Sequence, residues 1–326
     1  MPELSEDLPN GFRSSYTNCG EVRLHVVHNA RAEFSDGELD DLRTPILFLH
    51  GFPEYWAAWT PVLERLSDEF LLIAPDQRGY NLSDAPARIG DYSTKKLVSD
   101  MLALSSNLLG NRKLFLAGHD WGASVAYAAA INVPERIRGL IIVNGVHPAP
   151  FQRAIIEDPG QREASQYFHF LRNENAADRM AEDDFRRTFG MLEKFSDTAW
   201  LSEREKAGYR KAWSRPGRLN AMLNWYRASP IIVPVPGEPV PAAPLMDASP
   251  DRLAVRAPHL LIWGEKDTAL RASSRQGLAR FAPDLSVVEI EDGDHWVIHT
   301  HGARVADEIA RFVRSVEAGS RPPRPR

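Results

Sequence analysis

The fold is decided by residues 113–130, KLFLAGHDWGASVAYAAA. The first part of this stretch is a short apolar run typical of a buried strand, and the last part has the small and apolar residues of a packed helix. Between them lies a tight turn in which Gly118 and Gly122 stand on either side of Asp120. Glycines at these places let strand and helix approach closely, so that the central side chain projects above the sheet. The pattern predicts that Asp120 is a nucleophile.

The carboxylate at this turn has two interpretations. Aspartate is a preferred N-cap residue, so Asp120 could simply cap the helix that follows. A capping role, however, does not call for glycine on both sides. A carboxylate nucleophile can displace a leaving group from an sp3 carbon and form an ester, and a helix N-terminus favours its negative charge. We therefore prefer the nucleophile.

Apolar runs alternate with amphipathic stretches on both sides of this turn. Strands are expected in VRLHVV (22–27), PILFLHG (45–51), FLLIAPD (70–76), IRGLIIVNG (137–145), HLLIWGEKD (259–267) and LSVVEIEDGDHW (285–296), and helices at 56–66, 97–109, 122–131, near 272–281 and near 303–316. This alternation predicts an α/β fold in which helices cover a mostly parallel sheet.

The strand pattern disappears between residues 147 and 250. Charged and aromatic residues recur there at helical spacing, as in FRRTFGMLEKF (185–195), and a proline-rich run at 229–245 precludes a regular helix. We predict a helical cap at 147–250, inserted between the first part of the core at 1–146 and the second at 251–318, with a flexible tail at 319–326.

Composition narrows the class of partner. The 326 residues are 43% hydrophobic and 25% charged, with a net charge of -5. There is no basic surplus to predict binding to nucleic acid or to an anionic membrane. The single cysteine, Cys19, excludes an internal disulfide and fits a reducing compartment. The acidic N-terminal segment does not resemble a signal peptide, and no run of 18 apolar residues occurs. These features predict a cytoplasmic protein.

Two residues near the end of the chain complete a candidate triad. Asp267 ends one late strand and His295 follows the next, which gives the order nucleophile, acid, histidine. His295 would deprotonate a water that attacks the ester, while Asp267 orients the imidazole. Each could singly be a solvated loop residue, but their order and placement favour the triad. His299 and His301 are spaced like metal ligands, yet no further ligand cluster accompanies them, and we predict neither metal nor cofactor.

A second motif precedes the nucleophile. The strand at 45–51 runs into His50-Gly51-Phe52-Pro53. A loop at this place can supply one amide of an oxyanion hole, and the residue after the nucleophile supplies the other. Phe52 and Trp121 occupy these two positions. The alternative is that HGFP is only a turn, because glycine and proline commonly mark turns.

These motifs together resemble one family. HGFPEYWAAW (50–59), DQRGYNLSD (76–84), GHDWGA (118–123) and LNWYR (223–227), with the late Asp267 and His295, are similar to the α/β-hydrolase-fold epoxide hydrolases over most of the chain. The resemblance implies an α/β-hydrolase fold with an eight-stranded, mostly parallel sheet. It also implies an activity, the opening of a small apolar epoxide to a vicinal diol with water as co-substrate, and a role in detoxification.

The resemblance further implies two tyrosines in the cap that hydrogen-bond the epoxide oxygen and protonate it. Tyr226 matches one of them closely, and Tyr167, in SQYFHFLRNENAAD (165–178), is the best local match for the other. Both could instead be packing residues. Phe52, Trp121 and Trp225 are expected to line an apolar substrate pocket, in a monomer or a homodimer.

Other functions remain open. Haloalkane dehalogenases share the Asp-Trp pair but have Asn or Glu where this chain has Phe52. Fluoroacetate dehalogenases share HGFP but carry arginines where this chain has Trp121 and Ser124. Asn144 stands where some dehalogenases keep a triad carboxamide or acid. A weakly catalytic binding protein is a third possibility, against which the complete set of candidate triad residues argues.

Overall fold

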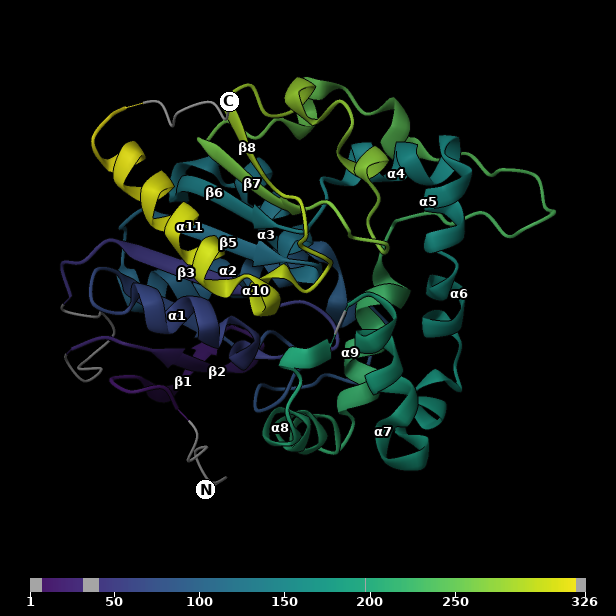
Figure 1. Cartoon of the computed structure of the whole chain (residues 1–326), viewed down its shortest axis with the longest axis horizontal. Coiled ribbons are helices and arrows are strands. Elements are labelled where there is room, and N and C mark those ends of the chain that lie inside the picture. The colour runs from purple at the N-terminus through teal and green to yellow at the C-terminus, as the bar shows by residue number, and fades with distance from the viewer. Residues whose placement is uncertain (1–7, 32–40, 197, 321–326) are drawn as a thin grey trace.

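The sheet is the frame of the molecule. The computed structural model describes residues 8–31, 41–196 and 198–320. Among these residues, eight strands form one sheet in the order β1-β2-β4-β3-β5-β6-β7-β8 (Figure 1). The strands are β1 Arg13–Cys19, β2 Val22–His28, β3 Pro45–Leu49, β4 Leu71–Pro75, β5 Leu114–His119, β6 Ile137–Val143, β7 His259–Gly264 and β8 Leu285–Ile290. β2 pairs antiparallel with β1 and β4, and the remaining pairs are parallel. The predicted fold class is confirmed.

Strand β1 was not expected from the sequence. Its residues, RSSYTNC, are mostly polar and carry no apolar run. The strand pairs with β2 along its whole length, from Arg13 opposite His28 to Cys19 opposite Val22. Cys19 is 3% exposed, and burial raises the pKa of its thiol to about 12. It therefore serves as a small apolar core residue and not as a reactive thiol.

Helices cover both faces of the sheet. In the first and last parts of the chain these are α1 Thr60–Leu66, α2 Thr94–Leu109, α3 Trp121–Asn132, α10 Val297–Thr300 and α11 Gly302–Glu317. α1 packs against α11 on one face, and α2 packs against α3 on the other (Figure 1). Within the described residues, no helix is both long and apolar enough to cross a membrane.

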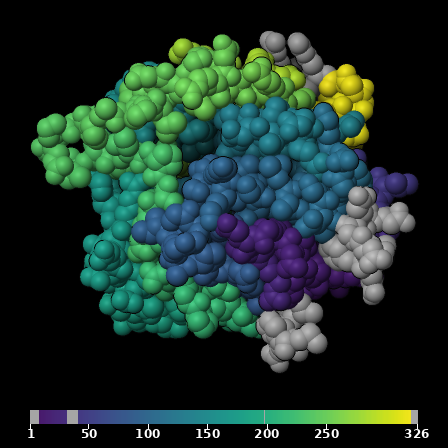
Figure 2. All heavy atoms as spheres, turned by 180° about the vertical axis from the view of Figure 1, so that it is seen from behind, coloured from purple at the N-terminus to yellow at the C-terminus, as the bar shows by residue number. Residues whose placement is uncertain are grey.

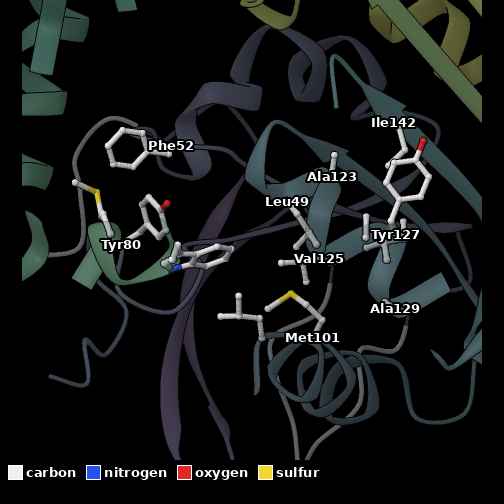
Figure 3. Packing of buried hydrophobic residues seen from close by; sticks show 14 of the residues in the cluster. Leu49, Phe52, Tyr80, Met101, Ala123, Val125, Tyr127, Ala129 and Ile142 are labelled. Carbon is white, nitrogen blue, oxygen red and sulfur yellow. The ribbon is translucent and has the colours of Figure 1, made fainter. Parts of the chain in front are cut away.

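The core divides into two layers because strand side chains alternate between the faces of a sheet. On β3, Ile46 and Phe48 join the layer under α1 and α11, whereas Leu47 and Leu49 join the layer under α2 and α3. Figure 3 shows part of the second layer, in which Leu49 lies with Met101 of α2 and Ala123 of α3. The small residues of α3 let this helix lie close to the sheet.

One predicted helix is wrong. Residues 272–281 form two short 3-10 helices, Ala272–Arg275 and Leu278–Arg280, and not one α-helix. Gln276 between them is extended, with φ -62° and ψ 130°, and Gly277 has φ +77°. The apolar spacing of this stretch is helical, but the backbone turns at the glycine. The remaining 3-10 helices are Trp56–Trp59, Ile89–Tyr92, Pro134–Arg136, Thr198–Trp200, Pro244–Asp247 and Pro250–Leu253.

Helices also fill the stretch between β6 and β7, which we call the inserted segment (residues 147–250). They are α4 Pro148–Glu157, α5 Pro159–Ala164, α6 Tyr167–Arg172, α7 Ala176–Lys194, α8 Glu203–Trp213 and α9 Arg218–Ala228. α7 is interrupted by non-helical residues at 182–185. After α9 the proline-rich chain has no helix until Pro244, as its composition predicts. The domain boundaries stay predictions, and residues 321–326 of the expected tail lie outside the described part.

Candidate active site

Asp120 is the only residue between β5 and α3, and its backbone is unusual. It has φ 51° and ψ -119°. Its side chain accepts a hydrogen bond from the Phe52 backbone N–H at 2.8 Å, and among the described residues it caps nothing in α3. The glycine at 122 is required by close approach, because a Cβ there would lie 2.1 Å from the carbonyl oxygen of Leu49. The capping interpretation is thus wrong, and the turn presents the carboxylate.

The structure brings the predicted triad together. Asp267 follows β7 and His295 follows β8. Nδ1 of His295 lies 2.8 Å from Oδ2 of Asp267, and Nε2 lies 3.6 Å from Oδ2 of Asp120. His295 is 3% exposed and Asp267 7% exposed. The imidazole is therefore buried between two carboxylates.

This position determines the charge of His295. Burial alone would lower its pKa, but the negative charges and hydrogen bonds of Asp267 and Asp120 outweigh burial and raise the pKa to about 10. At neutral pH the imidazole is therefore protonated as long as both carboxylates are ionised. The removal of either negative charge would lower that pKa.

Besides His295, three groups donate hydrogen bonds to Asp267. The backbone N–H groups of Ala269 and Leu270 each donate to its Oδ1 at 2.8 Å. Nδ2 of Asn144 donates to its Oδ2 at 2.7 Å, and Oδ1 of Asn144 accepts from the Gly264 N–H at 2.8 Å. Asn144 is thus a donor beside the candidate acid. Its place directly after β6, at the same edge of the sheet, is the signal that could have indicated this contact.

The two positions expected for the oxyanion hole adjoin the nucleophile. The Phe52 amide already donates to Asp120, as described above. Trp121 is the first residue of α3, so its N–H belongs to the helix N-terminus, where backbone N–H groups have no partner within the helix. The loop at Gly51 must pass close to the nucleophile, because a Cβ on this residue would lie 2.4 Å from Cβ of Asp120.

The two predicted tyrosines also meet here. Tyr167 begins α6 and Tyr226 lies in α9, and their ring centroids are 6.1 Å apart. The ring of Tyr226 packs edge-on against that of Trp121, with the centroids 4.9 Å apart. Burial, and then nearby negative charge that includes Asp120, raise the pKa of both phenols. Both are therefore protonated at neutral pH and can donate.

A cavity of about 570 Å³ opens beside these groups, a volume within the range of small-molecule sites. Its inner walls include Asp120, Trp121, Tyr167, Phe168 and Trp225. Trp225 is held by its indole N–H, which donates to the carbonyl oxygen of Arg78 at 3.0 Å. In Figure 2 a hollow lies where the blue segment near residue 100 faces the green segment near residue 245, and both segments line this cavity.

Phe52 is placed differently from Trp121 and Trp225. Its ring packs edge-on against that of Tyr226, with the centroids 5.0 Å apart, and is 3% exposed. It is not among the residues that line the cavity. The structure thus gives its backbone N–H a direct contact with Asp120 and gives its ring a contact with a candidate acid.

A buried polar cluster behind the triad was missed by the sequence analysis. Glu54 accepts hydrogen bonds from the hydroxyl of Tyr209 in α8 at 2.8 Å and from Nε2 of His299 at 2.7 Å. His119 lies 3.5 Å from the same carboxylate and donates to the carbonyl oxygen of His295 at 2.9 Å. Burial would raise the pKa of Glu54, but His299 and His119 lower it below its ordinary value.

His299 and His301, which are spaced like metal ligands in the sequence, have separate partners in the structure. His299 contacts Glu54, whereas His301 lies 3.1 Å from Asp292. The two imidazoles therefore turn to different carboxylates. The position of Glu54 directly after HGFP was the available signal for the cluster.

The fold and the site define a class of protein. A family model described as alpha/beta hydrolase fold matches residues 44–302. The chain belongs to this family and is a hydrolase.

Particular relatives are similar over nearly the whole chain. The AB hydrolase superfamily protein YfhM of Bacillus subtilis is 30% identical, over 94% of this chain and 99% of its own. A solved epoxide hydrolase from metagenomes of hot environments is 31% identical, with a TM-score of 0.77, over 93% of this chain and 98% of its own. The Bacillus megaterium epoxide hydrolase, solved with an inhibitor, is 25% identical, with a TM-score of 0.80, over 92% of this chain and 100% of its own.

Proposed function

We propose that this protein is an epoxide hydrolase that opens an epoxide to a vicinal diol through an ester on Asp120. The observation that carries the proposal is the arrangement around the nucleophile. A carboxylate on a strained turn faces a paired imidazole, and two tyrosines, the buried Tyr226 and the partly buried Tyr167, lie beside it. The solved epoxide hydrolases that share this fold over most of the chain support the same activity.

The first step forms the ester. A carboxylate oxygen of Asp120 attacks an epoxide carbon, a new C–O bond forms, and the ring C–O bond breaks. Tyr167 or Tyr226 donates a proton to the leaving oxygen, which would otherwise depart as a strongly basic alkoxide. Such a positioned acid contributes typically about 10²- to 10⁴-fold in rate. The contacts of the Tyr226 ring with Trp121 and with Tyr167 support this role, because they place the two phenols together beside the nucleophile before substrate binds.

The second step needs His295 as a base, and ester formation supplies the condition. The ester removes the negative charge of Asp120, one of the groups that raise the pKa of His295. The imidazole can then pass its proton towards the tyrosinate left by the first step. Neutral His295, oriented by Asp267, deprotonates a water that attacks the ester carbonyl. The amides of Phe52 and Trp121 hold the resulting oxyanion. Its collapse breaks the C–O bond to the diol oxygen, which takes a proton from His295, and the acid form of Asp120 then gives its proton to His295, so that the starting state is restored.

A dehalogenase fits the site less well. In such an enzyme the indole N–H of Trp121 would help to hold the halide, but here the Trp121 ring packs against Tyr226, with the centroids 4.9 Å apart. A halide leaves without a proton, so a dehalogenase would not need the tyrosines as acids. Asn144 donates to Asp267, so it supports that acid. A weakly catalytic binding protein would have no use for a complete triad.

Further expectations belong to this proposal. Residues 147–250 act as a cap that carries the tyrosines, and Trp121 and Trp225 contact the apolar part of the substrate. The protein works in the cytoplasm as a monomer or homodimer in detoxification, on a small molecule and water, without metal, cofactor, nucleic acid or membrane.

The test is to trap the ester. In His295→Gln the first step proceeds and the second stalls, so an epoxide should add its whole mass, oxygen included, to the peptide that contains Asp120. Intact-protein and peptide mass spectrometry would detect this adduct after incubation with epoxides and, separately, with haloalkanes. An alkyl adduct formed only from haloalkanes, with release of halide, would make the protein a dehalogenase. Absence of an adduct from either panel would favour the binding protein.

A further inference from the structure

The shape of the cavity identifies the class of epoxide. We infer that the preferred substrates are terminal epoxides with one long, unbranched apolar substituent that lies along α3. This inference rests on the proposed function and adds to it a length and a direction. It follows from which residues line the cavity, which residues fill the opposite side of the triad, and where the polar groups lie.

One face of α3 forms the floor of the cavity. Ser124, Ala128, Ile131 and Asn132 line it, all on the face set by helical spacing. Ser124 and Ala128 are small, so they leave room above the helix close to the nucleophile. From Trp121 to Asn132 a helix rises about 16 Å, which an extended chain of about a dozen carbon atoms would span. The floor thus sets a length and keeps the bound chain straight.

Apolar side chains from other elements also line this cavity. They are Leu97 of α2, Phe151 of α4, and Ile231 and Leu245 from the proline-rich return of the inserted segment. Leu97, Phe151 and Ile231 are at most 9% exposed without a ligand. A substituent enclosed by these side chains gains free energy with each buried methylene.

The other side of the triad is filled. Phe195 at the end of α7 lies with its ring 6.1 Å from that of His295 and 5.9 Å from that of Tyr167. Trp296 donates its indole N–H to the carbonyl oxygen of Leu192 at 2.9 Å, which ties the loop of His295 to α7. Leu192, Phe195 and Trp296 are each at most 8% exposed. The epoxide carbon on this side therefore has space for hydrogen only, which makes the epoxide terminal.

Hydroxyl groups of Thr94, Ser124 and Ser229 also line the cavity, and its exposed rim carries Asn132, Asp247 and Arg252. Ala128 and Ile131, which lie between Ser124 and Asn132 on the helix, are apolar, so a long chain is accommodated until it reaches this rim. A chain that extends beyond the rim re-enters water and gains nothing more.

The test compares matched substrates on the wild-type protein. Along the 1,2-epoxyalkanes from four to sixteen carbons, kcat/KM should rise by about two- to fourfold per methylene, then level off near twelve carbons. Among isomers of equal size, 1,2-epoxydecane should exceed trans-5,6-epoxydecane by at least about 100-fold. Equal rates for these isomers, or no dependence on chain length, would overturn the inference while leaving the proposed function intact. No hydrolysis of any epoxide would overturn both.

A pair of variants locates the chain on α3. Ala128→Phe places a large ring in the middle of the floor, and Ala128→Ser at the same position is the matched control. The ratio of kcat/KM for 1,2-epoxydodecane to that for 1,2-epoxybutane should fall at least about tenfold in Ala128→Phe and stay within about twofold in Ala128→Ser. Circular dichroism and thermal unfolding establish that both variants are folded. An unchanged ratio in folded Ala128→Phe would show that the substituent does not lie along α3.

Discussion

The two halves of the site are held in place by different forces. In the half that belongs to the sheet, Asp120, Asp267 and His295 follow β5, β7 and β8, and hydrogen bonds to backbone groups and to Asn144 fix the carboxylates. In the inserted segment, Tyr167 and Tyr226 lie within aromatic packing, in which Tyr226 contacts Trp121 and Tyr167 contacts Tyr226. The sheet half is determined by the backbone, whereas the inserted half is determined by how helices pack.

The difference separates two kinds of chemical work. The sheet half makes and breaks the bond to the enzyme, and its carboxylates must be charged for this. The inserted half supplies protons and apolar surface, and its groups must stay neutral and buried. Substitutions of the triad residues in the first half should therefore abolish turnover, while substitutions of the tyrosines in the second half should slow it.

The largest expected effect is at the nucleophile. Asp120→Asn keeps the size of the side chain, and asparagine tolerates a positive φ. Its amide cannot form the ester, so kcat should fall by about 10⁴-fold or more. Steady-state kinetics on a terminal epoxide, with a thermal melt as the control for folding, measure this. A variant that retains even a hundredth of the wild-type rate would contradict a role in bond formation.

The next effect is in the inserted half. Tyr226→Phe removes a proton donor that acts mainly in the transition state, so kcat should drop by about 10²- to 10⁴-fold with little change in KM. Tyr16→Phe on β1, far along the chain from the site, is the control and should behave like wild type. If Tyr226→Phe kept the wild-type kcat, Tyr226 would be a packing residue only.

A smaller effect on kcat is expected at Asn144, which donates a hydrogen bond to Asp267 in the sheet half. Asn144→Ala removes the donor to Asp267 and leaves the Gly264 N–H without its partner. We expect a loss of about 2 kcal/mol in the free energy of unfolding and a decrease in kcat of about tenfold, since Asp267 loses one of its fixed contacts. Urea unfolding and kinetics give both values, and Asn111→Ala, at an exposed position, is the control. An unchanged kcat in a destabilised variant would limit Asn144 to a structural role.

The smallest effect concerns the contact between the halves at Glu54. Its pKa is lower in the folded protein than the ordinary value of 4.5, so its stabilising contribution is complete above pH 4.5 and is lost as pH falls further. In Glu54→Gln the free energy of unfolding should be about 2 kcal/mol lower at pH 7, and this deficit should shrink between pH 5 and pH 3. Glu64→Gln, on the exposed side of α1, is the control. A deficit that does not change with pH would contradict a charged Glu54.

The sequence predicted the sheet half of the site better than the inserted half. Asp120, Asp267 and His295 could be predicted because glycines mark the strained turn and apolar runs mark the strands that end at these residues. Tyr226 was found only by resemblance, since no local pattern distinguishes a proton donor from a packed tyrosine.

The features that the sequence did not predict also have physical causes. β1 forms because it pairs with β2, and its polar residues do not predict this pairing. The cluster at Glu54 joins residues from distant parts of the chain, and the helix expected at 272–281 is broken by the backbone at Gly277. For β1 and for Glu54 the deciding interaction is not local.

The claim that the sheet half forms a covalent ester is tested most directly by one turnover in water labelled with ¹⁸O, with enzyme in excess over a terminal epoxide. In the proposed reaction the water attacks the carbonyl carbon of the ester, so the oxygen delivered to the diol comes from Asp120. Mass spectrometry should therefore find an unlabelled diol and one ¹⁸O in the peptide that contains Asp120. A diol labelled in the first turnover, with an unlabelled peptide, would show that water attacks the epoxide directly and that no ester forms.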